Sequence, residues 1–119
     1  MRSYTTMSER KVLVIDLDGT ICEQTSGGTA YRDAKPVDVV IDRLRVLRRA
    51  GWKIVIHTAR GMRSWIAQTP EETYGQMTRD WLLRHRVPYD ELVFGKPAGD
   101  LYVDDKGASI AEFLAREVD

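Results

Sequence analysis

Two aspartates, Asp16 and Asp18, follow directly after a continuous apolar run at residues 11–15. Aliphatic and β-branched side chains throughout such a run predict a parallel strand that is buried on both faces. Ligands of open α/β sheets bind at the carboxyl ends of strands, and Gly19 would allow the chain to turn sharply there. Because two close carboxylates repel each other, a divalent cation would stabilise them, and their hard oxygens favour Mg²⁺. For an isolated Asp-x-Asp-Gly-Thr stretch, a solvated acidic turn is the alternative to a metal-binding site. The residues in the rest of the chain are needed to distinguish the two.

Polar residues also follow the later predicted strands, at residues 52–58, 91–94 and 101–103. These residues are Thr58 and Arg60, on either side of Ala59, at the end of the second strand, Lys96 after the third, and Asp104 and Asp105 after the fourth. An acidic pair in a loop is weak support for a site. Charged or hydroxyl groups at the ends of three of four strands, with a lysine before the fourth, are much stronger support and predict one shared site.

The elements between these strands are predicted to be helices. Apolar residues recur at helical spacing after Pro36, and Gly51 should end that helix. A second helix should begin at Thr69 and a third at Ser109, because each is followed three residues later by a glutamate that would complete a capping box. A strand, a helix and a strand in this order predict a right-handed crossover between parallel neighbours, which places Thr58 beside Asp16.

The length and composition fit one small domain. The chain has 119 residues, and its 18 basic and 18 acidic residues cancel, which gives no argument for a nucleic-acid or membrane-surface binder. Cys22 is the only cysteine, so no intramolecular disulfide can form, and we expect it to be an ordinary small apolar residue. No apolar run could span a bilayer, and the N-terminus lacks the apolar core of a signal peptide, so we expect a cytoplasmic protein. Residues 1–10 should be a flexible terminus, and 11–119 one catalytic domain with a short flap at 21–34.

In this order and spacing, the motifs resemble those of the haloacid dehalogenase (HAD) superfamily of aspartate-nucleophile phosphatases. The stretch from Asp16 to Thr20 matches the first motif, Asp-x-Asp-Gly-Thr, and Thr58 matches the second. Lys96 matches the third motif, and the pair Asp104 and Asp105 matches the fourth. More narrowly, the segments 58–62 and 95–106 are similar to those of small phosphatases linked to capsule polysaccharide biosynthesis.

The resemblance implies a role for each matching residue. Asp16 would be the nucleophile that forms an aspartyl-phosphate, and Asp18 would be the general acid and base. Thr58 and Lys96 would bind phosphoryl oxygens, with backbone N–H groups of the loops at Leu17 and Ala59 completing the cradle. The resemblance also implies a Mg²⁺ ion, with ligands from Asp16, the Asp18 carbonyl and Asp104, and with Asp105 assisting directly or through water.

The implied fold is a Rossmann-like α/β fold in three layers. We expect a mostly parallel sheet of about four strands ordered 4-1-2-3, with helices on both faces. The stretch between the second and third motifs has no room for a folded cap domain. Family members without a cap either act on large substrates or close their site with a neighbouring subunit, so a homo-oligomer would suit this chain. Contacts to the leaving group should then come from Tyr31 and Arg32 in the flap and from Arg60.

Three functions remain open at this point. The first is a Mg²⁺-dependent phosphatase for a small phosphorylated sugar or a related metabolite. The second is the same chemistry on a macromolecule, either a nucleic-acid end or a phosphoprotein, although zero net charge argues against nucleic acid. The third is a non-enzymatic phospho-receiver or binding module. Receiver domains also combine an acidic cluster, a Thr and a Lys, but their phosphoacceptor aspartate follows a later strand than the first.

Overall fold

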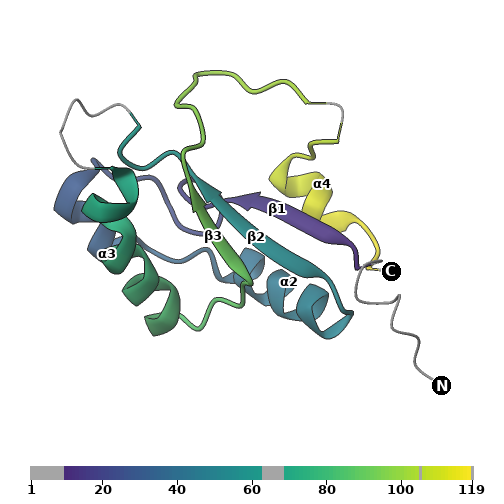
Figure 1. The fold of residues 1–119 in the computed structure, drawn as a ribbon. Helices are drawn as coiled ribbons and strands as arrows, with labels where there is room; N and C mark the ends of the chain where they lie inside the picture. Colours follow the sequence, from purple (N-terminus) through teal and green to yellow (C-terminus); the bar gives the residue numbers. More distant parts are fainter. Residues whose placement is uncertain (1–9, 63–68, 105, 119) are drawn as a thin grey trace.

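The strands form a parallel sheet with β2 at its centre, as Figure 1 shows. The computed structural model describes residues 10–62, 69–104 and 106–118, so most of the predicted flexible terminus lies outside the described residues. The strands are β1 (Val12–Asp16), β2 (Lys53–Thr58) and β3 (Glu91–Phe94), in the order β1-β2-β3. In register, Asp16 lies beside His57 and Thr58 lies beside Phe94. The carboxyl ends of the three strands therefore meet at one end of the sheet.

Helices begin close to the positions that the sequence predicts. They are α2 (Asp38–Arg49), α3 (Pro70–Arg84) and α4 (Ile110–Ala115), with a short 3₁₀ helix η1 (Gly28–Asp33) before them. Both predicted capping boxes are present: Thr69 pairs with Glu72, and Ser109 pairs with Glu112. In the part of the chain that the structure describes, no helix combines the length and apolar character needed to cross a membrane.

The hydrophobic core lies on one face of the sheet. Ile15, Ile54 and Ile56 from the strands pack there with side chains of α2 and α3, and Phe113 and Leu114 of α4 meet the same cluster. On the opposite face, Val12, Val14 and Val93 are exposed among the residues that the structure describes. The predicted fold class, a parallel α/β sheet flanked by helices, is confirmed, and the described residues form no cap domain.

In two respects the described residues differ from the expected sheet ordered 4-1-2-3 with helices on both faces. The first concerns the helices. Both crossovers run in the same direction across the sheet, from β1 to β2 and from β2 to β3. A right-handed crossover then places α2 and α3 on the same face. A helix on the other face would require the chain to return past β1, and the described residues between β3 and α4 form no helix or strand.

The second difference is the fourth strand, which was a wrong prediction. Leu101 and Val103 are 82% and 90% exposed, and residues 101–103 do not pair with β1. The Tyr102 hydroxyl donates to the Pro97 carbonyl at 2.7 Å and accepts from Gly99 N at 2.8 Å. These bonds fold the segment back on its own loop, and a run of only three apolar residues offers too few ladder hydrogen bonds to compete.

The flap at residues 21–34 is anchored at both ends. Ile21 and Cys22 are fully buried at its start, and Ala34 is buried at its end. Trp81 of α3 donates its indole N–H to the Ala34 carbonyl at 2.9 Å. Only the middle of the flap is left to border the site.

Candidate active site

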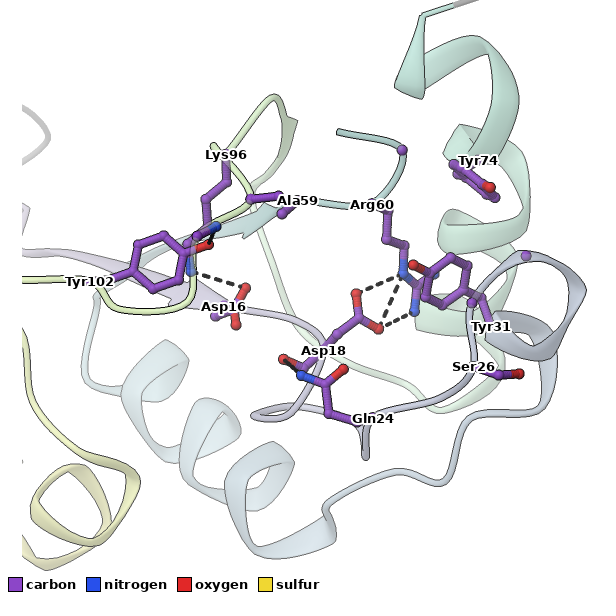
Figure 2. A pocket seen from close by; sticks show the side chains of 15 residues that line it. Asp16, Asp18, Gln24, Ser26, Tyr31, Ala59, Arg60, Tyr74, Lys96 and Tyr102 are labelled. Carbon is purple, nitrogen blue, oxygen red and sulfur yellow. Dashed lines mark hydrogen bonds and ion pairs between the residues drawn. The ribbon is translucent and has the colours of Figure 1, made fainter. Parts of the chain in front are cut away.

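The loop after β1 presents two carboxylates to the same pocket (Figure 2). Leu17, between them, is fully buried, and its carbonyl accepts hydrogen bonds from the backbone N–H groups of residues 20–22. Gly19 has φ +85°, the left-handed conformation that glycine adopts at little cost, so the turn after the strand forms as predicted. Because Leu17 is fixed in the core, Asp16 and Asp18 on either side of it are left to border the pocket.

Lys96 follows β3 at the opposite edge of the sheet, and its side chain reaches Asp16 at the end of β1. Its backbone N–H donates to the Thr58 carbonyl at 3.2 Å, which continues the pairing of β2 and β3 by two residues. Its Nζ lies 3.4 Å from Asp16 Oδ1 and 4.2 Å from the centre of the Tyr102 ring. The predicted nucleophile and the predicted phosphate-binding lysine are therefore neighbours.

Thr58 is fully buried at the end of β2 and does not line the pocket. Its hydroxyl oxygen accepts a hydrogen bond from the Arg60 backbone N–H at 3.1 Å. The hydroxyl thus shapes the turn after β2, and Ala59 in that turn does border the pocket. The predicted contact of Thr58 with a phosphoryl oxygen stays a prediction.

Arg60 lies against the second carboxylate. Its Nη2 is 2.9 Å from Asp18 Oδ1, and its Nε is 3.0 Å from Oδ2. The Tyr31 ring covers the guanidinium at 4.0 Å, and Tyr31 in turn meets Tyr74 edge to face, with the ring centres 5.4 Å apart. Burial, and then the nearby Asp18 charge, raise the pKa of Tyr31, so its hydroxyl stays protonated.

Cys22 lies behind Asp18, with its Sγ 3.5 Å from Asp18 Oδ1. Burial, followed by the charge of Asp18, raises the pKa of this thiol to about 12. The thiol is therefore neutral at physiological pH and unsuited to act as a nucleophile. This agrees with its expected role as a small packed residue.

The pocket has a volume of about 520 Å³. Six of the predicted site residues line it: Asp16, Asp18, Tyr31, Ala59, Arg60 and Lys96. Leu17, Thr58, Arg32 and Asp104 are not among its lining residues, and Asp105 lies outside the described residues. Four further side chains line the pocket that were not predicted as site residues: Gln24, Ser26, Tyr74 and Tyr102. The polar flap pointed toward the first two, whereas Tyr74 resembled a core residue of its helix and Tyr102 belonged to a predicted strand.

A metal site is only partly assembled. Asp16 and Asp18 line the pocket, but Asp104 is exposed, and its Oδ1 accepts a hydrogen bond from Lys106 N at 2.8 Å. Among the residues that the structure describes, no group of three or more His, Cys, Asp or Glu side chains is placed to hold a metal ion. The Mg²⁺ site expected from the resemblance therefore remains a prediction.

Comparison with known proteins identifies similar folds. No protein-family model and no curated protein matches the chain. A structural-genomics target protein from Vibrio cholerae matches with 35% identity and a TM-score of 0.74, over 90% of this chain and 89% of that one. A chain in the structure of the Pnkp1/Rnl/Hen1 complex matches with 22% identity and a TM-score of 0.56, over 81% of this chain and 30% of that chain. D,D-heptose 1.7-bisphosphate phosphatase from B. bronchiseptica matches with 15% identity and a TM-score of 0.52, over 76% and 52% respectively.

The parallel sheet and the aspartates at the end of β1 together define an α/β protein with a HAD-like fold. The structures with 22% and 15% identity support this fold but do not show an activity or a substrate. At 35% identity over most of both chains, the protein belongs to the same family as the Vibrio cholerae protein.

Proposed function

We propose that this protein is a phosphatase that hydrolyses a phosphate monoester through an aspartyl-phosphate on Asp16. The observation that carries the proposal is the pair of aspartates in one pocket, with Lys96 Nζ 3.4 Å from Asp16 Oδ1. A lysine beside the nucleophile offsets the charge repulsion between a carboxylate and an incoming phosphate dianion. The second aspartate supplies the proton transfer that an alkoxide leaving group needs.

The proposed reaction has two displacements at phosphorus. In the first, an Asp16 carboxylate oxygen bonds to phosphorus, and the bond from phosphorus to the leaving oxygen breaks. The leaving oxygen keeps that electron pair and takes the proton of the Asp18 carboxyl group. In the second, a water oxygen bonds to phosphorus while Asp18 takes a proton from that water. The bond between phosphorus and Asp16 then breaks, which releases inorganic phosphate and restores both aspartates.

We further propose a small phosphorylated sugar or a related metabolite as the substrate. Polar flap residues and tyrosines border the pocket, and such groups commonly bind sugars by hydrogen bonding and stacking. The resemblance to capsule polysaccharide phosphatases and the fold likeness to a heptose bisphosphate phosphatase support the same class. That enzyme was crystallised with magnesium and phosphate, which supports Mg²⁺ as the cofactor proposed for this chain. A second copy of the chain could supply the cover that a cap provides elsewhere.

A phosphorylated nucleic-acid end is the second candidate substrate. The fold likeness to a chain of the Pnkp1/Rnl/Hen1 RNA repair complex favours it, at 20% identity and a TM-score of 0.56. The balanced charge of the chain argues against it, because binding to a phosphate backbone normally relies on excess basic residues.

A panel of phosphorylated sugars, other metabolites and phosphorylated oligonucleotide ends tests both candidates. We expect phosphate release with Mg²⁺, fastest on a sugar phosphate and absent in Asp16→Asn. Preferential release from oligonucleotide ends would favour the second candidate. No release from any substrate, or equal release by Asp16→Asn, would refute the proposed function.

A further inference from the structure

The side chain of Arg60 is bound to Asp18 in a fork. Its Nε lies 3.3 Å from Oδ1 and 3.0 Å from Oδ2, and its Nη2 lies 2.9 Å from Oδ1. Paired hydrogen bonds of this kind fix the plane of a carboxyl group as well as its distance. The Arg60 side chain has no exposed surface, whereas the Asp18 side chain is 17% exposed. The carboxyl group therefore keeps some access to solvent while the guanidinium behind it has none.

The remaining contacts of Arg60 also lie within the protein. Its Nη1 donates to Thr78 Oγ1 of α3 at 2.9 Å, and Thr78 is fully buried. Its Nη2 lies 3.9 Å from Cys22 Sγ, and the Tyr31 ring covers the plane of the guanidinium (Figure 2). Each guanidinium nitrogen thus has a protein partner, which leaves Arg60 poorly placed to bind an acidic group of a substrate.

The two carboxylate oxygens of Asp18 have different hydrogen-bond partners. Oδ1 accepts from Nε and Nη2 of Arg60 and also faces the Cys22 thiol, whereas Oδ2 accepts only from Nε among the described residues. Oδ2 therefore has the greater capacity left to exchange a proton. Arg60 itself is tied to the end of β2 through Thr58 and to α3 through Thr78.

We propose that Arg60 is a positioning residue: it holds the Asp18 carboxyl group with Oδ2 available for proton transfer, and it does not bind the leaving group. This inference rests on the proposed phosphatase function. It differs from the role in leaving-group recognition that the sequence suggested for Arg60. A positioning residue should matter most where the leaving group depends most on the proton that Asp18 supplies.

The dependence on the leaving group is the test. Glycerol 2-phosphate releases an alkoxide that needs protonation, whereas p-nitrophenyl phosphate releases a stable phenolate. In Arg60→Lys, kcat on glycerol 2-phosphate should fall about 10²-fold more than kcat on p-nitrophenyl phosphate, with little change in KM. Arg79→Lys is the matched control, because Arg79 is partly exposed on α3 and pairs with Glu71. It should leave both rates unchanged.

A double variant separates positioning from an independent role. If Arg60 acts through Asp18, then Asp18→Asn with Arg60→Lys should be no slower on glycerol 2-phosphate than Asp18→Asn alone. Equal losses on both substrates in Arg60→Lys, or losses that multiply in the double variant, would overturn the proposal. If Arg60→Lys does not fold, Thr78→Val serves instead, since it loosens the guanidinium and keeps its charge. It should give a severalfold loss confined to glycerol 2-phosphate, and equal losses would again overturn the proposal.

The activity of the wild-type protein separates the proposed phosphatase function from the proposed role of Arg60. Turnover that is abolished in Asp16→Asn supports the phosphatase, whatever Arg60→Lys does. Wild-type turnover of p-nitrophenyl phosphate but not of glycerol 2-phosphate would show that Asp18 does not protonate the leaving oxygen. That result would overturn the acid role of Asp18 and the positioning role of Arg60, and it would leave the covalent step on Asp16 standing. Turnover of neither substrate, together with no phosphate release from the wider panel of phosphorylated sugars, metabolites and oligonucleotide ends, would refute the phosphatase and the positioning role together.

Discussion

Lys96 Nζ lies 3.4 Å from Asp16 Oδ1, so the residue that follows β3 reaches the end of β1 across the central strand. The contact depends on the backbone bond between Lys96 and the Thr58 carbonyl, and on the ring of Tyr102 beside the ammonium group. Tyr102 is held in turn by its own hydrogen bonds within the loop. The loop after β3 therefore positions a cation beside the proposed nucleophile.

Removing this cation should impair catalysis. Lys96→Met keeps much of the side-chain length but removes the charge, and kcat/KM for phosphate release should fall by about 10²–10³. Steady-state phosphate release measures the effect. Lys106→Met, which changes an exposed lysine of the same segment, is the control and should stay close to wild type. Equal activity of the two variants would remove Lys96 from the site.

The anchor of the flap predicts an effect on stability. Trp81→Phe would remove the indole donor to the Ala34 carbonyl and leave a gap in the core. The free energy of unfolding should fall by about 1–3 kcal/mol in urea titrations. Leu83→Ala on the same helix alters a side chain that is 79% exposed, and it should change stability by no more than about 0.5 kcal/mol. If both variants were equally stable, Trp81 would not be the anchor.

Cys22 predicts a pH dependence of stability. The pKa of its thiol is about 12 in the folded protein, against an ordinary value of 9.0. Because the pKa of the thiol is higher in the folded protein than in the unfolded chain, the protonated thiol contributes to the free energy of unfolding. This contribution is complete below pH 9.0 and is lost as the pH rises toward 12. The wild type should therefore lose more stability than Cys22→Ala between these pH values in thermal melts. Parallel melting curves for the two proteins over this range would contradict the burial of the thiol.

Metal binding tests the remaining acidic residues. We expect calorimetry to detect Mg²⁺ binding, EDTA to abolish activity, and Asp104→Ala to weaken binding more than Asp105→Ala does. Such a result would require the segment around Asp104 to approach the pocket, because Asp104 does not line it here. Unchanged Mg²⁺ affinity in Asp104→Ala would instead exclude Asp104 as a ligand.

The sequence predicted the parts of the fold that follow from local patterns. The apolar runs before Asp16 and Thr58 form strands, and the capping boxes at Thr69 and Ser109 start helices. The predicted burial of the first strand on both faces was wrong, because Val12 and Val14 on one of its faces are exposed. Prediction also failed for residues 101–103, because three apolar residues suit a strand locally, while pairing with β1 depends on contacts far apart in the chain. The exposure of one face of the sheet could not be predicted for the same reason, because it also depends on contacts between segments far apart in the chain.

The site was predicted through residue types, and its finer geometry was not. Asp16, Asp18 and Lys96 do meet, because parallel strands bring their carboxyl ends together. Arg60 appeared to be a residue for the substrate, since a guanidinium near a strand end suits an anion. The structure shows that the Arg60 guanidinium already donates hydrogen bonds to Asp18 and Thr78. Pairings of this kind depend on the packing of α3, which the sequence does not encode locally.

The covalent intermediate is the central claim, and acid quenching during turnover of a ³²P-labelled monoester tests it most directly. Acyl phosphates survive acid but are cleaved by hydroxylamine. The wild type should therefore retain label that hydroxylamine releases, and Asp16→Asn should retain none and show at least about a thousandfold lower turnover. Label on Asp16→Asn, or its undiminished turnover, would contradict nucleophilic attack by Asp16.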